Sequence, residues 1–219
     1  MSGGPAATRV LAVARYLTAD LVRSQRFLLP PVAYAGVLAV LFTGDPGPAP
    51  AYWAASALAA YPVATWLTIV VAGGEDPVQR TVTVASAGGH AVVAGATVLV
   101  ALAGDVVLVA LAVLAPLIAT PGPVVPHLGL AIAAHLACAL AGTAVGLLTG
   151  RPLLHRVGWS FCVAALVVLV TGTQGSWPPV GTAVTALSDG GAAPLGAVAL
   201  AAALVAASAV VTIAVYSRR

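Results

Sequence analysis

Apolar residues along this chain fall into six long blocks, and polar residues are confined mostly to the stretches between them. A helix rises 1.5 Å per residue, so about 20 apolar residues cross a bilayer core of about 30 Å. The pattern predicts an all-α integral membrane protein with a single transmembrane domain over residues 1–219. Its six transmembrane helices are expected at about 28–42, 52–72, 91–119, 127–149, 158–173 and 194–215.

The stretch that precedes the first block is amphipathic at the helical period. Over residues 8–27, Val10, Leu17 and Leu21 share one face, while Arg and Asp residues occupy the rest of the surface. A helix of this kind lies in the membrane interface instead of crossing the bilayer. We expect it to meet the first transmembrane helix at an elbow formed by Pro30-Pro31.

A polar island at residues 74–89 separates the second and third blocks. Asp76 suits the N-cap of a short helix, Pro77 its first helical position, and Gln79 the return arm of a capping box. Gly88-Gly89 supplies a left-handed stop. The island therefore predicts a capped helix at 76–88, either a docking element for a soluble partner or a polar hairpin that only reverses the chain.

The remaining connections are rich in Gly and Pro. Residues 44–48 and 120–123 are expected to form turns. The block at 91–119 is longer than a bilayer core requires and is interrupted only by Gly104-Asp105, so we expect one tilted, kinked or protruding helix. Residues 174–193 form a polar connection whose apolar middle, 180–187, is a candidate re-entrant segment before the sixth transmembrane helix.

Composition supports the membrane class. The chain is 61% hydrophobic and 7% charged, whereas soluble domains carry about 25% charged residues. All nine basic residues are Arg, and with abundant Ala, Val and Gly this suggests a GC-rich bacterial genome. With six helices and a cytoplasmic N-terminus, all nine Arg fall on the cytoplasmic side. We therefore expect a multi-pass protein of the bacterial cytoplasmic membrane with both termini and the 76–88 helix inside.

Several kinds of chemistry are excluded or weak. A P-loop needs a Lys, which the chain lacks, and no hydrolase or zinc motif is present. We expect no enzyme activity, no bound cofactor or metal, and no nucleic-acid partner. Asp105 and His135 lie at membrane depth, where they either form a proton relay or serve structure, at a helix boundary or in a helix–helix hydrogen bond. Glycines at 142, 146 and 150 favour close packing within the chain.

Two stretches carry a resemblance to a known family. One is the N-terminal helix, with Ala14-Arg15-Tyr16-Leu17 and Arg23-Ser24-Gln25-Arg26-Phe27-Leu28-Leu29, and the other is Glu75-Asp76-Pro77-Val78-Gln79-Arg80. Together with the six-helix topology, they resemble actinobacterial permease subunits of ATP-binding-cassette (ABC) exporters of the second type. The resemblance covers the whole chain as a topology, and its specific sequence match is limited to these stretches.

The resemblance implies a function and its partners. Residues 8–27 would be the connecting helix and 76–88 the coupling helix that docks a separate ATPase subunit, which binds ATP and Mg. A second permease subunit, identical or related, would complete the translocation path in the lipid bilayer. The residues implied in coupling to the ATPase are Glu75, Asp76, Pro77, Gln79 and Arg80, supported by Arg15, Arg23 and Arg26.

Two other functions remain open at this point. One is a proton-coupled secondary transporter or channel that uses Asp105 and His135. The other is the substrate-binding membrane subunit of a vitamin-type importer, which has a similar length and number of helices. The outer connections offer few ligand contacts besides Trp177 and Asp189.

Overall fold

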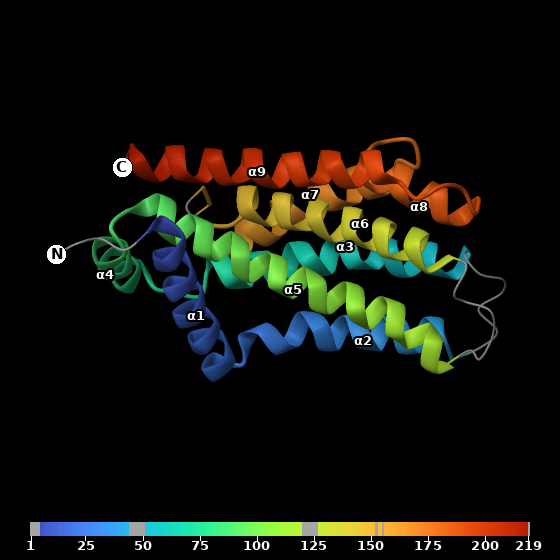
Figure 1. Cartoon of the computed structure of the whole chain (residues 1–219), viewed down its shortest axis with the longest axis horizontal. Helices are drawn as coiled ribbons and strands as arrows, with labels where there is room; N and C mark the ends of the chain where they lie inside the picture. The colour runs from blue at the N-terminus through green and yellow to red at the C-terminus, as the bar shows by residue number, and fades with distance from the viewer. Residues whose placement is uncertain (1–4, 44–50, 120–126, 152, 155, 219) are drawn as a thin grey trace.

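The computed structural model describes residues 5–43, 51–119, 127–151, 153–154 and 156–218, and the helices among them form an elongated bundle (Figure 1). The predicted turns at 44–48 and 120–123 lie outside the described residues. Along the bundle run α2 (Leu29–Leu41), α3 (Ala51–Ala72), α5 (His90–Ala119), α6 (Leu128–Thr149), α7 (Val157–Gly172) and α9 (Leu195–Ser217). The shorter α4 (Pro77–Ala87) and α8 (Val180–Ser188) lie at opposite ends. The described residues contain no strand, so the predicted all-α class is confirmed over them.

The predicted amphipathic N-terminal helix is present as α1 (Ala6–Ser24), which lies across one end of the bundle (Figure 1). It meets the short 3₁₀ helix η1 (Arg26–Leu28) and α2 at an angle of 86°. The elbow is at Gln25, whose φ of 55° is left-handed, and the predicted elbow at Pro30-Pro31 is wrong. Both prolines lie in the first turn of α2, where a missing N–H costs no hydrogen bond.

Among the described residues, four helices are long and apolar enough to cross a membrane: α3, α5, α6 and α9. Counting the bent pair of α1 with η1 and α2 as one crossing gives five. The chain is thus built as a multi-pass membrane protein, and α5 is one continuous helix, as expected for 91–119. The predicted six crossings require α2, with 13 residues, and α7, with 16, to serve as short transmembrane helices, and that number stays a prediction.

The two central helices of the bundle, α3 and α6, pack closely because glycines face the contact. A Cβ atom on Gly146 would lie 2.6 Å from Cβ of Thr68, and one on Gly150 would lie 3.3 Å from Cβ of Ala72. The glycines at 142, 146 and 150 therefore serve packing within the chain, as predicted. Around this contact lies a core of small residues with Trp53 and Tyr61.

The apolar segment before the last helix forms α8, at the end of the bundle opposite α4 (Figure 1). Its Val180, Ala183 and Leu187 are buried against α3 and α6. These residues are spaced three and four apart, so one face of α8 packs into the bundle and the other is exposed. The predicted segment at 180–187 is therefore a packed helix, and its depth in a membrane stays a prediction.

Candidate functional site

The elements that carry the described Arg residues gather at one end of the bundle. This end holds α1, α4, the C-terminal end of α6 and the C-terminal end of α9 (Figure 1). We call it the Arg-rich end. That it faces the cytoplasm is a prediction from the positive-inside rule. The helix α4, which lies between α3 and α5 in the chain, is beyond the ends of α3 and α6 at this end of the bundle (Figure 1), and part of its surface is exposed.

Both predicted caps of α4 are present. The Oδ1 atom of Asp76 accepts hydrogen bonds from the backbone N–H groups of Val78 at 2.8 Å and Gln79 at 2.9 Å. At the other end, Gly88 is left-handed with φ of 83°, and the N–H of Gly89 donates to the carbonyl of Val84 at 3.0 Å. An 11-residue helix is marginal in isolation, so these caps help to define where it starts and stops.

The predicted return arm of the capping box is wrong. The side chain of Gln79 donates a hydrogen bond to the hydroxyl of Tyr16 in α1, not to the backbone of Asp76. At the far end of α4, Arg9 donates to the carbonyl of Ala87 at 3.3 Å. Because both ends of α4 are bonded to α1, the two helices are held together as one unit.

The inner side of α4 is held by a buried carboxylate. Glu75 is 2% exposed, and its Oε1 accepts a hydrogen bond of 2.6 Å from the hydroxyl of Thr83. Its Oε2 forms an ion pair of 4.0 Å with Arg80, which also donates to the carbonyl of Ala72 at 3.3 Å. The carbonyl of Glu75 accepts from Arg151 at 3.5 Å. Glu75 therefore fixes α4 to the ends of α3 and α6, and its carboxylate does not face outward.

The C-terminal end of α9 joins the same arrangement through aromatic contacts. The guanidinium of Arg80 lies 4.9 Å above the ring of Tyr216, a distance suited to a cation–π interaction. The ring of His90, at the start of α5, stacks on Tyr216 at 5.2 Å with 7° between the planes. Arg80 thus links α4 to both Glu75 and α9, so it too is turned inward.

The outer side of α4 is apolar and uncovered. Val78 is 75% exposed and Val82 is 65% exposed, and Thr81 and Ala85 beside them are exposed as well. We call these four residues the outer ridge of α4. A groove of about 420 Å³ runs beside the ridge, between α4 and α1, and is lined by Val82, Tyr16 and others. The ridge is not among the contact residues expected from the sequence, although Val78, Val82 and Ala85 are spaced so that they share one face of a helix.

The structure separates the predicted coupling residues into two groups. Asp76 and Pro77 are exposed at the start of the outer ridge, Gln79 is half-buried, and Glu75 and Arg80 face inward. Arg15, Arg23 and Arg26 are exposed, and among the described residues none of them forms a hydrogen bond with α4. Arg9 and Tyr16 bond α1 to α4 instead.

Asp105 and His135 are both buried and belong to separate hydrogen-bond networks. Asp105, on α5, accepts a bond of 2.7 Å from Thr143, whose hydroxyl lies 3.2 Å from that of Thr68. Oδ1 of Asp105 has no hydrogen-bond partner among the described residues. His135 pairs through Nε2 with Ser56 at 2.9 Å. Since His135 and Thr143 are two turns apart on α6, about 12 Å, the two side chains do not form a relay by direct contact.

The structure gives His135 the helix–helix hydrogen bond that one interpretation expected, since Ser56 lies on α3. Its Nδ1 lies 2.7 Å from the carbonyl oxygen of Ala131, which can only accept, so Nδ1 carries the proton. Among the described residues, no three His, Cys, Asp or Glu side chains gather as metal ligands. The hydrogen bonds of Asp105 and His135 thus join helices to one another.

Comparison of the chain with models of protein families, with curated proteins and with solved structures gave no match. Its function has to be inferred from its own residues: the inward-facing contacts that hold α4, and the apolar ridge that α4 leaves uncovered.

Proposed function

We propose that this chain is the permease subunit of an ABC exporter in a bacterial cytoplasmic membrane and that the outer ridge of α4 docks its ATPase subunit. One observation carries the proposal: α4 is fixed from the inside by Glu75 and α1, while Val78 and Val82 point away from the bundle. A hairpin that only reverses the chain needs neither a buried carboxylate nor bonds at both ends.

Exposed valines at the tip of a polar connection favour a protein partner. Burial of a Val side chain is worth about 1.5–3 kcal/mol, so covering Val78 and Val82 together favours association by several kcal/mol before the cost of ordering the interface. The helix α4 lies beyond the ends of α3 and α6 (Figure 1), so lipid tails around those helices would not cover it. A groove on the partner that has an apolar floor and a hydrogen-bond donor for the Asp76 carboxylate would fit the outer ridge.

In this proposal the partner subunit hydrolyses ATP. The chain contains no Lys and therefore no P-loop, so ATP and Mg would be bound by the ATPase subunit. Movement of the ATPase would push α4, and α4 would transmit the displacement to α1 through the hydrogen bonds at its two ends. A second permease subunit would complete the path, and the resemblance described above supports both the pairing and the direction of export.

The test is purification in mild detergent from the native host, with and without Val82→Asp. We expect an ATPase subunit to co-purify with the wild-type chain and to be lost with Val82→Asp, because the new carboxylate would be desolvated in the docked complex. Ser176→Asp is the matched control, since it adds the same charge at an exposed site outside α4. Membrane insertion should be unchanged in both variants.

Two results would count against the proposal. One is a wild-type preparation without any nucleotide-binding partner, and the other is equal recovery of the ATPase with Val82→Asp and with Ser176→Asp. The proton-coupled alternative is less favoured, because Asp105 and His135 lie in separate networks. Nothing in the described outer connections favours the importer alternative.

A further inference from the structure

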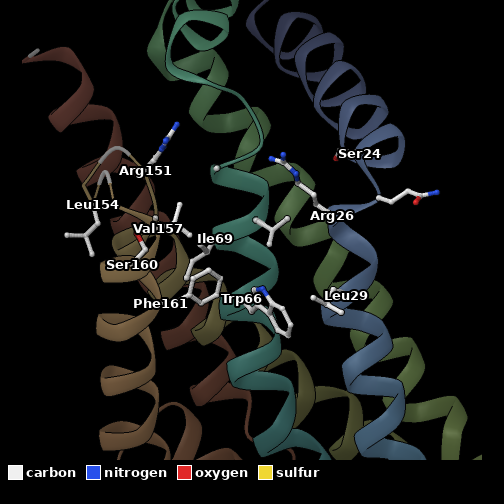
Figure 2. Close-up of a pocket in the computed structure, with 14 residues that line it drawn as sticks. Ser24, Arg26, Leu29, Trp66, Ile69, Arg151, Leu154, Val157, Ser160 and Phe161 are labelled. Carbon is white, nitrogen blue, oxygen red and sulfur yellow. The ribbon is translucent and has the colours of Figure 1, made fainter.

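A pocket of about 470 Å³ lies below the elbow between α1 and α2, on the side of α3. Figure 2 shows its walls: α2 on one side, α7 on the other and α3 between them. Its volume falls within the range of about 300–1,000 Å³ typical of ligand sites. The pocket is distinct from the outer ridge of α4 and shares no residue with it.

The upper part of the pocket is positively charged. Arg26 extends from the elbow toward α3, and Arg151 lies on the opposite side, above α7 (Figure 2). Over the described residues, Arg151 donates to a neutral backbone carbonyl, and the single ion pair joins Arg80 to Glu75. Neither Arg26 nor Arg151 is therefore neutralised by a carboxylate in the part of the chain that the structure describes. Two guanidinium groups in this situation favour a phosphate or another anion.

The lower part of the pocket is apolar and aromatic. Trp66 and Phe161 meet edge to face, with ring centroids 6.4 Å apart and an angle of 80°. Leu29 and Ile69 extend the same surface (Figure 2). Trp66 lies six residues before the end of α3, which places it about 9 Å below the Arg-rich end. This separation matches the step from a lipid headgroup to its first acyl carbons.

The pocket opens sideways from the bundle. Both α2 and α7 pack on α3, but over the described residues they make at most isolated contact with each other. Leu29 is 59% exposed and Phe161 is 37% exposed on the two sides of this gap. A molecule lying in the membrane can therefore enter between α2 and α7 without first passing through water.

We propose that this pocket binds one anionic membrane lipid, with its phosphate between Arg26 and Arg151 and an acyl chain over Trp66 and Phe161. Charge complementarity selects the headgroup, and the lateral opening at the level of the elbow selects a membrane lipid over a soluble anion. The proposal concerns binding alone and does not depend on the docking of an ATPase.

The test uses Trp66 as the reporter, in nanodiscs of zwitterionic lipid. A minor fraction of the lipid carries bromine atoms on its acyl chain and is either phosphatidylglycerol or phosphatidylcholine. Bromine quenches a Trp that it touches, and subtraction of the spectrum of Trp66→Phe isolates the reporter from the other three Trp residues. We expect brominated phosphatidylglycerol to quench Trp66 at a lower fraction than brominated phosphatidylcholine.

The double variant Arg26→Gln/Arg151→Gln should remove this preference. An Arg near a membrane surface contributes about a fivefold preference for anionic lipid, so two contribute about 25-fold. Arg15→Gln/Arg23→Gln is the matched control, because it removes the same charge from the same end of the molecule but not from the pocket. The control should keep the preference, and circular dichroism checks that both variants are folded.

Three outcomes would overturn the proposal. Equal quenching of wild-type Trp66 by the two lipids would mean that the pocket contacts lipid without a preference for the anionic headgroup. Absence of quenching by either lipid would mean that a second copy or another segment covers the pocket. Equal loss of the preference in the two double variants would mean that the preference comes from the general positive charge of this end and not from the pocket. The first two outcomes need only the wild type and Trp66→Phe, so a folding defect in the Arg variants cannot obscure them.

Discussion

Substitution of Gly142 by Ala tests the close contact at the centre of the bundle. A Cβ at this position would lie 2.4 Å from the carbonyl oxygen of Tyr61 and 2.8 Å from Cβ of Ala64. The first distance is about 1 Å short of the 3.4 Å at which ordinary van der Waals contact begins. Because the nearest obstacle is backbone on α3, α3 and α6 would have to move apart by about that amount.

The expected magnitude follows from two opposing effects. Overpacking of a close contact costs about 1–3 kcal/mol. Replacing Gly by Ala inside a helix stabilises that helix by up to about 1 kcal/mol. With the full gain the net cost is about 0–2 kcal/mol, and the backbone obstacle at 2.4 Å places Gly142→Ala in the upper half of that range, at about 1–2 kcal/mol. Gly129→Ala, on the same helix, meets nothing within 4 Å and should be neutral or stabilising.

The assay is equilibrium unfolding in mixed micelles of dodecyl maltoside and sodium dodecyl sulfate, followed by circular dichroism. The reasoning requires the midpoint of Gly142→Ala to fall below that of the wild type and the midpoint of Gly129→Ala not to fall. Equal midpoints for the two variants would refute the close approach of α3 and α6. If Gly142→Ala changed the oligomeric state and left the midpoint unchanged, Gly142 would lie at an interface between subunits and not between α3 and α6.

The remaining predictions concern the polar contacts. Asp76→Ala should lower the stability of α4 by about 1 kcal/mol and speed hydrogen exchange of the two amides that Asp76 caps about fivefold. Asp76→Ser should have neither effect, because Ser is also a good N-cap residue, and mass spectrometry of exchanged peptides measures the difference. Thr83→Val should destabilise by about 1–3 kcal/mol in the unfolding assay, because it leaves Oε1 of Glu75 buried without its donor, and Thr83→Ser should restore stability. The effects of Asp105→Asn and His135→Gln on stability should add to within about 0.5 kcal/mol in a double-mutant cycle, and a larger coupling would mean that the two networks communicate.

Local signals in the sequence predicted the two ends of α4 correctly, although not the bond of Gln79. An Asp before Pro and a pair of glycines after the helix determine its ends through contacts within a few residues. The long apolar stretch at 91–119 likewise predicted one continuous helix. Features of this kind depend on neighbours along the chain, so the sequence alone contains them.

Contacts between distant parts of the chain could not be predicted in this way. Tyr16 and Gln79 are 63 positions apart, and no pattern in either stretch pairs them. The inward-facing Arg80 also lies over the ring of Tyr216, which is on the last helix. The elbow was misplaced because a Pro pair is equally compatible with a bend and with the start of a helix, and a left-handed Gln25 has no signature of its own.

The position of α1 has a consequence for the order of events during synthesis. This helix leaves the ribosome before α4 and α5, yet Arg9 bonds to Ala87, 78 residues later, and the apolar face of α1 packs on α5. At a translation rate of about 5–20 residues per second, α1 waits roughly 4–16 s for these partners. During this interval an amphipathic helix without its protein contacts would rest on the membrane surface. The helix α1 therefore reaches its final place only after α4 and the first half of α5 have been made, and an early stop before α5 would leave it on the lipid.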